Sequence, residues 1–210
     1  MVVDPRLDLL DQARRLRRAI VTAARDLFLA QGYAATTIDA IAQAAHVSRR
    51  TVFNSAGGKA TLLKLAYEWA IVGDDEPVAL AERPAVKAIQ AEPDPQKALA
   101  LWAQMVAEVA TRVAPISEVL TAAADADPDA AQLVADAGRD RMSGATAFVR
   151  YLTSLDGLAP GITQQHAADL CWALMDGHLY RRLITQRGWT TTDFTQWLSS
   201  IVAASLLRTP

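Results

Sequence analysis

Apolar residues recur at spacings of three and four along most of this chain of 210 residues. The clearest example holds Leu16, Ile20, Ala24 and Phe28, and its arginines fall largely on the other side. A repeat of about 3.6 residues places such side chains on one face of an α-helix, whereas a half-buried strand needs strict alternation. Because the pattern persists and alternation is rare, the sequence predicts an all-α protein.

Glycines and prolines divide this pattern into separate helices. The first helix is expected to stop at Gln31-Gly32, and a long one to start at Lys59 after Gly57-Gly58. Residues 73–95 are rich in proline and acids, which predicts a connector with one short helix near 85–91. Further helices are expected at roughly 95–113, 115–124, 128–154, 163–187 and 191–207, with a break at Pro115 among others.

Two short helices are predicted between Gly32 and Gly57. Thr37 is a good N-cap for the first of them, and Ser48 for the second, which follows a break at His46-Val47. The second helix runs from Arg49 to about residue 55 and has few apolar residues. A helix so polar is either solvated or lies against a polar partner.

The charge is distributed unevenly along the chain. Its formal net charge is −2, so the whole molecule does not resemble a nucleic-acid binder. Residues 1–70, however, have a balance of +4, and residues 71–210 a balance of −6. A basic N-terminal part predicts an anionic partner for that part alone.

Three helices in a row, with a polar third one inside a basic segment, predict a helix-turn-helix. The major groove of DNA is about 12 Å wide and accepts one helix, whose exposed face must offer donors and acceptors to the bases. The third helix supplies such groups in Arg49, Arg50, Thr51, Asn54 and Ser55. An ordinary solvated surface helix is the alternative for the arginine pair.

Residues 14–66 resemble the N-terminal domain of the TetR family of transcription regulators, with no gap in the spacing. The matching residues are Ile20, Ala23-Ala24, Leu27-Phe28, Gly32, Thr36-Thr37, Ile41-Ala42, Val47-Ser48, Thr51-Val52-Phe53-Asn54, Lys59 and Leu62-Leu63. A looser similarity to the last two helices of many members covers Trp172 to Leu198. The resemblance implies a helix-turn-helix domain over 1–58, joined by a linking helix to a helical dimerisation and effector-binding domain over 59–210.

The same resemblance implies roles for single residues. Thr37 and Lys59, each at the start of a helix, would contact phosphates, and Phe53 stands where the family usually has Tyr. His46 replaces the usual turn glycine, and His tolerates a left-handed conformation better than most residues. The predicted DNA-binding set is Thr37, Ser48, Arg49, Arg50, Thr51, Phe53, Asn54 and Lys59, with Ser48 chiefly a cap.

An effector pocket is predicted in the C-terminal part, between the helices near 95–113, 128–154 and 163–187. Its candidate lining is large and mostly apolar, which favours a lipophilic effector. The alternative is that these residues simply form the core. The candidates are Trp102, Met105, Phe148, Trp172, Met175 and His178. The helices near 163–187 and 191–207 are expected to build a homodimer.

Other functions find little support in the sequence. We see no phosphate-binding glycine loop, nucleophile elbow or clustered metal ligands, so we predict neither an enzyme nor a cofactor or metal. The single cysteine, Cys171, excludes an intrachain disulfide, and no signal peptide or membrane span is evident, so we expect a cytoplasmic protein. The predicted function is therefore a DNA-binding regulator. The family resemblance implies that it is a repressor, released from a palindromic operator by a small lipophilic effector. The alternative is a helical small-molecule-binding protein whose DNA-binding head has decayed.

Overall fold

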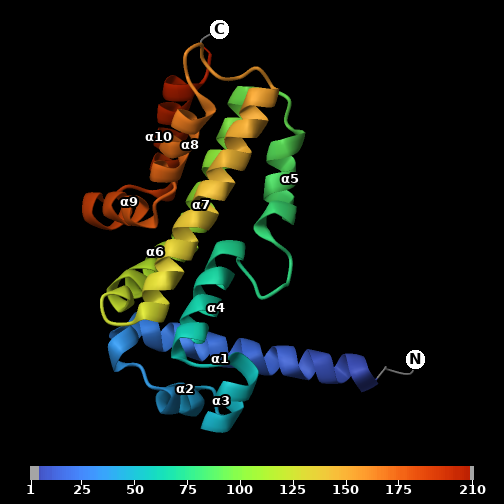
Figure 1. The fold of residues 1–210 in the computed structure, drawn as a ribbon, viewed down its shortest axis with the longest axis vertical. Coiled ribbons are helices and arrows are strands. Elements are labelled where there is room, and N and C mark those ends of the chain that lie inside the picture. Colours follow the sequence, from blue (N-terminus) through green and yellow to red (C-terminus); the bar gives the residue numbers. More distant parts are fainter. Residues whose placement is uncertain (1–4, 209–210) are drawn as a thin grey trace. The chain divides into compact units, whose positions relative to one another are not determined.

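The computed structural model describes residues 5–208, and the side chains from Leu10 onward. Helices connected by short loops make up this part of the chain (Figure 1). Within the described residues there is no strand, and a single isolated bridge pairs Leu158 with Leu207. The predicted all-α class is confirmed.

The helices follow the predicted order. They are α1 (Pro5–Ala35), α2 (Ile38–Ala44), α3 (Arg49–Ala56), α4 (Lys59–Val72), a short 3₁₀ helix (Leu80–Glu82), α5 (Pro84–Ala91), α6 (Pro95–Ala124), α7 (Pro128–Ser154), α8 (Gln164–Leu174), α9 (Gly177–Arg181), a π-helical turn (Arg182–Gln186) and α10 (Thr191–Leu206). The predicted stop at Gly32 is visible inside α1, where this residue has a φ of 80°. A left-handed φ is open to glycine without steric cost, so the chain turns there before α2.

The chain forms two compact units. The first consists of the chain up to Ala70 together with Ile116–Val134, and the second of Ile71–Pro115 together with the chain from Ala135. Helices α4, α6 and α7 therefore contribute residues to both units. The predicted boundary after residue 58 concerns the division of functions and stays a prediction.

The core of the first unit fixes the three N-terminal helices. Each of its helices contributes side chains with little or no exposure to solvent. They include Ile20 and Phe28 of α1, Ile41 of α2, Val52 of α3, Leu62 and Leu63 of α4, and Ile116 and Leu120 of α6. Burying a side chain of this size contributes about 1.5–3 kcal/mol, so this shared core keeps α1, α2 and α3 in one arrangement.

The break predicted at Pro115 is wrong, because α6 continues through this residue to Ala124. A proline inside a helix removes a hydrogen bond and crowds the preceding turn, at a cost of about 3 kcal/mol. Here the flanking residues are buried on both sides: Val113 and Ala114 in the second unit, and Ile116 in the first. Burial of the flanking turns outweighs the cost of the proline.

The single helix predicted over 163–187 is also wrong. The chain leaves the helix after Leu174, and α9 begins at Gly177. Asp176 is the N-cap of α9, and its carboxylate accepts a hydrogen bond from the backbone N–H of His178 at 2.7 Å. Aspartate competes with helical hydrogen bonding in this way, so a residue suited to a cap interrupts an apolar periodic segment.

Aromatic residues form much of the core of the second unit. Trp102 of α6 stacks on Phe148 of α7, with 4.7 Å between ring centroids and 5° between ring planes. Tyr180 of α9 meets Phe194 of α10 edge to face. The hydroxyl of Tyr180 lies 2.8 Å from that of Thr111. These contacts join α6, α7, α9 and α10 around one core.

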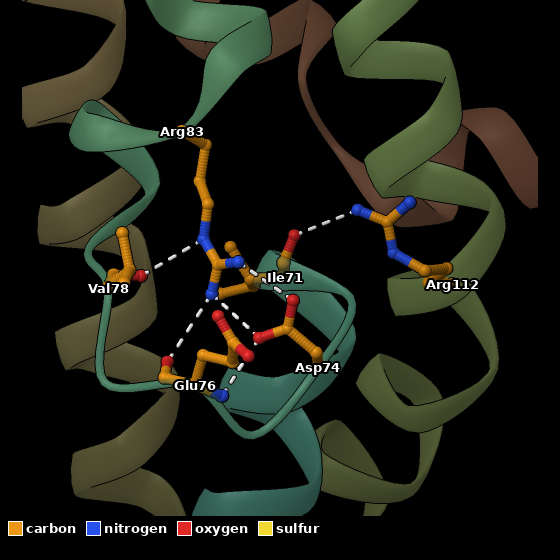
Figure 2. A network of polar contacts seen from close by, with 6 residues as sticks. All are labelled: Ile71, Asp74, Glu76, Val78, Arg83 and Arg112. Atoms are coloured by element: carbon orange, nitrogen blue, oxygen red, sulfur yellow. Dashed lines mark hydrogen bonds and ion pairs between the residues drawn. The ribbon is translucent and has the colours of Figure 1, made fainter.

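An ion pair fastens the loop that follows α4 (Figure 2). Both terminal nitrogens of Arg83 donate to the carboxylate of Asp74 at 2.7 Å, and Nε of Arg83 donates to the carbonyl of Val78 at 3.1 Å. Arg112 donates to the carbonyl of Ile71 near the end of α4. Bidentate pairing fixes both distance and direction, so the Asp74–Arg83 clasp orders residues 74–83.

We expect Arg83→Met to loosen this loop selectively. Amide exchange of residues 74–83 should accelerate while that of α6 and α7 stays unchanged. The hydrogen bonds from Arg83 hold the pKa of Asp74 below its ordinary value. A carboxyl whose pKa is lowered by folding stabilises the protein above its unfolded pKa, about 3.9, and loses that contribution as the pH falls through the folded pKa. The difference in amide exchange between the wild type and Arg83→Met should therefore vanish in acid, below the folded pKa of Asp74.

The matched control is Arg150→Met, which removes an exposed arginine of α7 instead. It should leave the exchange of residues 74–83 as in the wild type. A uniform acceleration throughout the second unit in Arg83→Met would contradict a local role for the clasp.

Candidate nucleic-acid interface

Helix α3 has one buried face and one exposed face. Ser48 caps its start, since Oγ accepts a hydrogen bond from the backbone N–H of Thr51 at 3.0 Å. Val52 and Ala56 are buried against the core of the first unit. The exposed residues are Arg49, Arg50, Phe53 and Asn54. At 100° per residue they span an arc of about 140°, so they form a single face.

The two arginines of this face differ in their contacts. Arg49 forms an ion pair with Asp39 of α2 at 3.2 Å, and its guanidinium lies 5.9 Å from the ring centroid of Phe53. Arg50 has no hydrogen bond or ion pair with a described residue, and neither does the Asn54 side chain. Arg49 is thus oriented by its neighbours, whereas the donors of Arg50 and Asn54 remain available to a ligand.

Phe53 is an unusual residue to find at the centre of this polar face. Its side chain is 46% exposed. The ring lies between the two arginines around the helix and cannot donate a hydrogen bond. In DNA the corresponding apolar group is the methyl of thymine, which protein side chains contact in the major groove.

The hydroxyl groups predicted to contact DNA already take part in hydrogen bonds within the chain. Ser48 Oγ and Thr51 Oγ1 lie 2.8 Å apart, in addition to the capping bond. Thr37 is exposed at the start of α2, where Oγ1 accepts from the backbone N–H of Ala40 at 3.1 Å. The structure therefore supports capping for Ser48 and Thr37, as predicted, and leaves the hydroxyl proton of Thr37 for donation.

The turns around α3 use two residues with positive φ. His46, with a φ of 54°, is in the left-handed conformation expected of the residue at this turn. Gly57 ends α3 with a φ of 80°, and a Cβ there would lie 3.1 Å from the side chain of Thr61. A larger residue at 57 would meet both backbone strain and a close contact. These turns fix the direction of α3 relative to α2 and α4.

Lys59 has partners of its own within the first unit. Its ammonium donates to the carbonyl of Tyr33 at 3.0 Å and lies 4.1 Å from the centroid of the Tyr33 ring. The Tyr33 hydroxyl in turn donates to the carboxylate of Asp127 at 2.6 Å. This bond lowers the pKa of Asp127, while burial and the same carboxylate raise the pKa of Tyr33. A phosphate contact by Lys59 stays a prediction. The ammonium would have to bind the phosphate while it also contacts Tyr33.

Sequence reasoning missed Tyr33, Asp39 and Asp127. Tyr33 and Asp127 are 94 positions apart, so no local pattern announces their hydrogen bond. Asp39 follows Thr37 by two residues and pairs with Arg49 only because α2 and α3 pack together.

Five of the six predicted effector residues lie in or against a single core. Trp102 and Phe148 are buried with 2% and 6% exposure, and Met105, Trp172 and Met175 pack partly buried against the same core. His178 is half-buried at the start of α9. The indole N–H of Trp172 donates to the carbonyl of Gly138 at 3.1 Å. The stacked pair is therefore accounted for by core packing alone, whereas the partly exposed members remain candidates for ligand contact.

The described residues contain no group of three or more His, Cys, Asp or Glu residues placed to hold a metal ion. None of their helices combines the length and the apolar character needed to cross a membrane.

Comparisons with known proteins agree with the helix-turn-helix geometry. Residues 20–66 match the family model described as bacterial regulatory proteins, tetR family. This range contains α2, α3 and most of α4. Among curated proteins, no sequence matches the chain.

Solved structures resemble the chain over almost its whole length. NalD of Pseudomonas aeruginosa, a secondary repressor of the MexAB-OprM multidrug efflux pump, has 22% identity and a TM-score of 0.71, with 93% of this chain and 98% of that chain covered. SmeT in complex with triclosan has 17% identity and a TM-score of 0.66, with 92% of each chain covered. Residues 20–66 thus match the tetR family of bacterial regulatory proteins, and the chain as a whole has the all-α fold of these solved TetR-family structures.

Proposed function

We propose that this protein binds a palindromic DNA operator as a homodimer and represses transcription until a small molecule releases it. The exposed face of α3 carries this proposal. Arg50 and Asn54 offer donors that have no partner among the described residues, and a capped helix on a packed support presents them. Arg side chains bind guanine and Asn side chains bind adenine by paired hydrogen bonds in the major groove.

The roles within the interface divide by chemistry. Arg50, Asn54 and Arg49 would read base edges, with Phe53 against a thymine methyl group. Thr37 and Lys59 would contact phosphates, and Ser48 with Thr51 would hold the start of α3. Phosphate contacts position the protein, whereas base contacts give sequence preference.

A homodimer follows from the needs of this interface. One helix in one groove binds weakly, and two-fold symmetry places a second α3 about 34–36 Å away, one turn along the DNA. We propose α8 and α10 as the pairing surface. In α10, Leu198, Val202 and Leu206 are fully buried within the chain, but Ile201 is 38% exposed and available to a partner.

The test is selection of binding sequences from random duplexes, together with sedimentation of the free protein. We expect a two-fold symmetric sequence to emerge. The free protein should sediment at twice the chain mass of 22.6 kDa. Failure to enrich any sequence would favour the alternative of a ligand-binding protein whose DNA-binding head has decayed, while a persistent monomer would overturn the dimer.

We propose a lipophilic effector that contacts the partly exposed side chains Met105, Trp172 and Met175, with His178 as a polar handle. Two structural neighbours contain small molecules: triclosan in SmeT, and choline in a regulator of Saccharomonospora viridis. A ligand shifts a protein only through different affinities for its two states. Compounds that raise the melting temperature must therefore also weaken binding to the selected duplex. Stabilising ligands that leave DNA affinity unchanged would refute the sensor role.

A further inference from the structure

We propose that the first half of α1 carries a second DNA-binding surface, which contacts the sugar-phosphate backbone outside the bases read by α3. The surface consists of Arg14, Arg15, Arg17 and Arg18, which we name the arginine stripe. This inference rests on the proposed function and adds a surface to it.

The arginine stripe is exposed along its whole length. All four side chains are open to solvent, and Leu16 between them is half-buried against the core of the first unit. At 100° per residue the four arginines span an arc of about 160° centred opposite Leu16. Leu16 therefore fixes the rotation of the helix, and the arginines face away from the core.

The stripe remains basic after its acidic neighbours are counted. Residues 5–19 hold five arginines and two aspartates, a balance of +3. Asp11, one turn before Arg14 and Arg15, balances part of this charge. Like charges four residues apart, such as Arg14 and Arg18, destabilise a helix. An anionic partner would offset that cost.

The packing of α1 places the arginine stripe next to the helix-turn-helix that contains α3. Helix α1 packs against both α2 and α3, and Ile20 is the first fully buried residue among its described side chains. Figure 1 shows α1 continuing past α2 and α3 toward the N-terminus. Arg14, the far end of the arginine stripe, lies six residues before Ile20, a rise of about 9 Å at 1.5 Å per residue. That length equals about three base pairs at 3.4 Å each.

Double-stranded DNA is the partner that fits these observations. The phosphate charge of DNA continues beyond any operator. Arginines next to the helix-turn-helix can therefore contact phosphates whatever the flanking sequence. Guanidinium groups bind phosphate oxygens in a bidentate manner. Each contact releases counterions and steepens the log–log dependence of affinity on salt by about 0.9.

The experiment compares the wild type with R14Q/R15Q/R17Q/R18Q on two duplexes. One carries the selected operator alone, and the other adds ten base pairs of arbitrary sequence at each end. The wild type should bind the longer duplex at least tenfold more tightly, with a salt slope steeper by about 2 or more. The variant should bind the short duplex much as the wild type does and gain nothing from the flanks.

The matched control, R139Q/R150Q/R182Q/R187Q, removes the same charge from exposed arginines of the second unit and should keep the gain from flanks. Circular dichroism of the stripe variant must show retained helix. If the wild type binds both duplexes equally, the flank contact is wrong while the proposed function stands. If the wild type prefers no sequence, the proposed function fails and this inference with it. An equal loss by the variant on both duplexes would also overturn the inference, since the stripe would then act within the operator.

Discussion

We expect Arg50→Ala to weaken binding to the selected operator by about 30-fold or more. A paired contact from arginine to guanine contributes about 1–3 kcal/mol of discrimination, and a symmetric dimer loses two such contacts. A total of about 2 kcal/mol corresponds to roughly 30-fold in affinity. Arg50 is exposed and has no partner among the described residues, so its removal leaves no buried group unpaired in the free protein.

The measurement is a titration of labelled operator and of an unrelated duplex of equal length. Binding to the unrelated duplex should fall much less, because only a general charge is lost there. Arg150→Ala, which removes an exposed arginine of α7, is the control and should change neither affinity by more than a small factor. Equal losses on both duplexes would assign Arg50 to the phosphate backbone and refute its role in reading bases.

Trp102→Ala should lower the free energy of unfolding by about 3–5 kcal/mol. Truncating a buried tryptophan removes the favourable free energy of burying its apolar surface and leaves a cavity. Trp102 is 2% exposed and stacks on Phe148, so the stacking contact is lost as well. For a chain of this size about 1 kcal/mol shifts the melting temperature by 2–4 °C, so a decrease of at least about 6 °C is expected.

Trp172→Ala separates the core from the proposed effector surface. Trp172 is only partly buried, and Arg141 lies 4.8 Å from the centroid of its ring. We expect a stability loss less than half that of Trp102→Ala, together with loss of effector affinity. Trp102→Phe, which keeps an aromatic ring against Phe148, should recover much of the stability. A stable Trp102→Ala protein with altered ligand binding would instead place Trp102 in an effector site.

Prediction from sequence succeeded where the signal is local. The caps Thr37 and Ser48, the turn residues His46 and Gly57, and the end of the first helix at Gly32 each depend on a few neighbouring residues. A capping hydroxyl or a positive φ acts within one turn of the chain. The polar exposed face of α3 was predictable for the same reason, since helix geometry alone separates Arg50 and Asn54 from Val52.

Local rules failed where packing competes with them. Pro115 normally ends a helix, but burial of Ala114 and Ile116 on either side holds α6 continuous. The opposite error occurred at Asp176, where an apolar periodic segment is interrupted by a cap. At Pro115 the outcome depends on contacts with helices far away in the sequence, whereas at Asp176 a local cap outweighs the apolar periodicity.

The sequence by itself determined the all-α class, the helix-turn-helix and the chemistry of its exposed face. Tertiary structure alone decided which of these side chains are engaged. Lys59 donates a hydrogen bond to Tyr33, Tyr33 donates one to Asp127, and Trp102 is buried in a stack with Phe148. The physical reason is that periodicity and capping follow from the geometry of one helix, whereas hydrogen-bond partners and burial depend on which helices come to lie side by side.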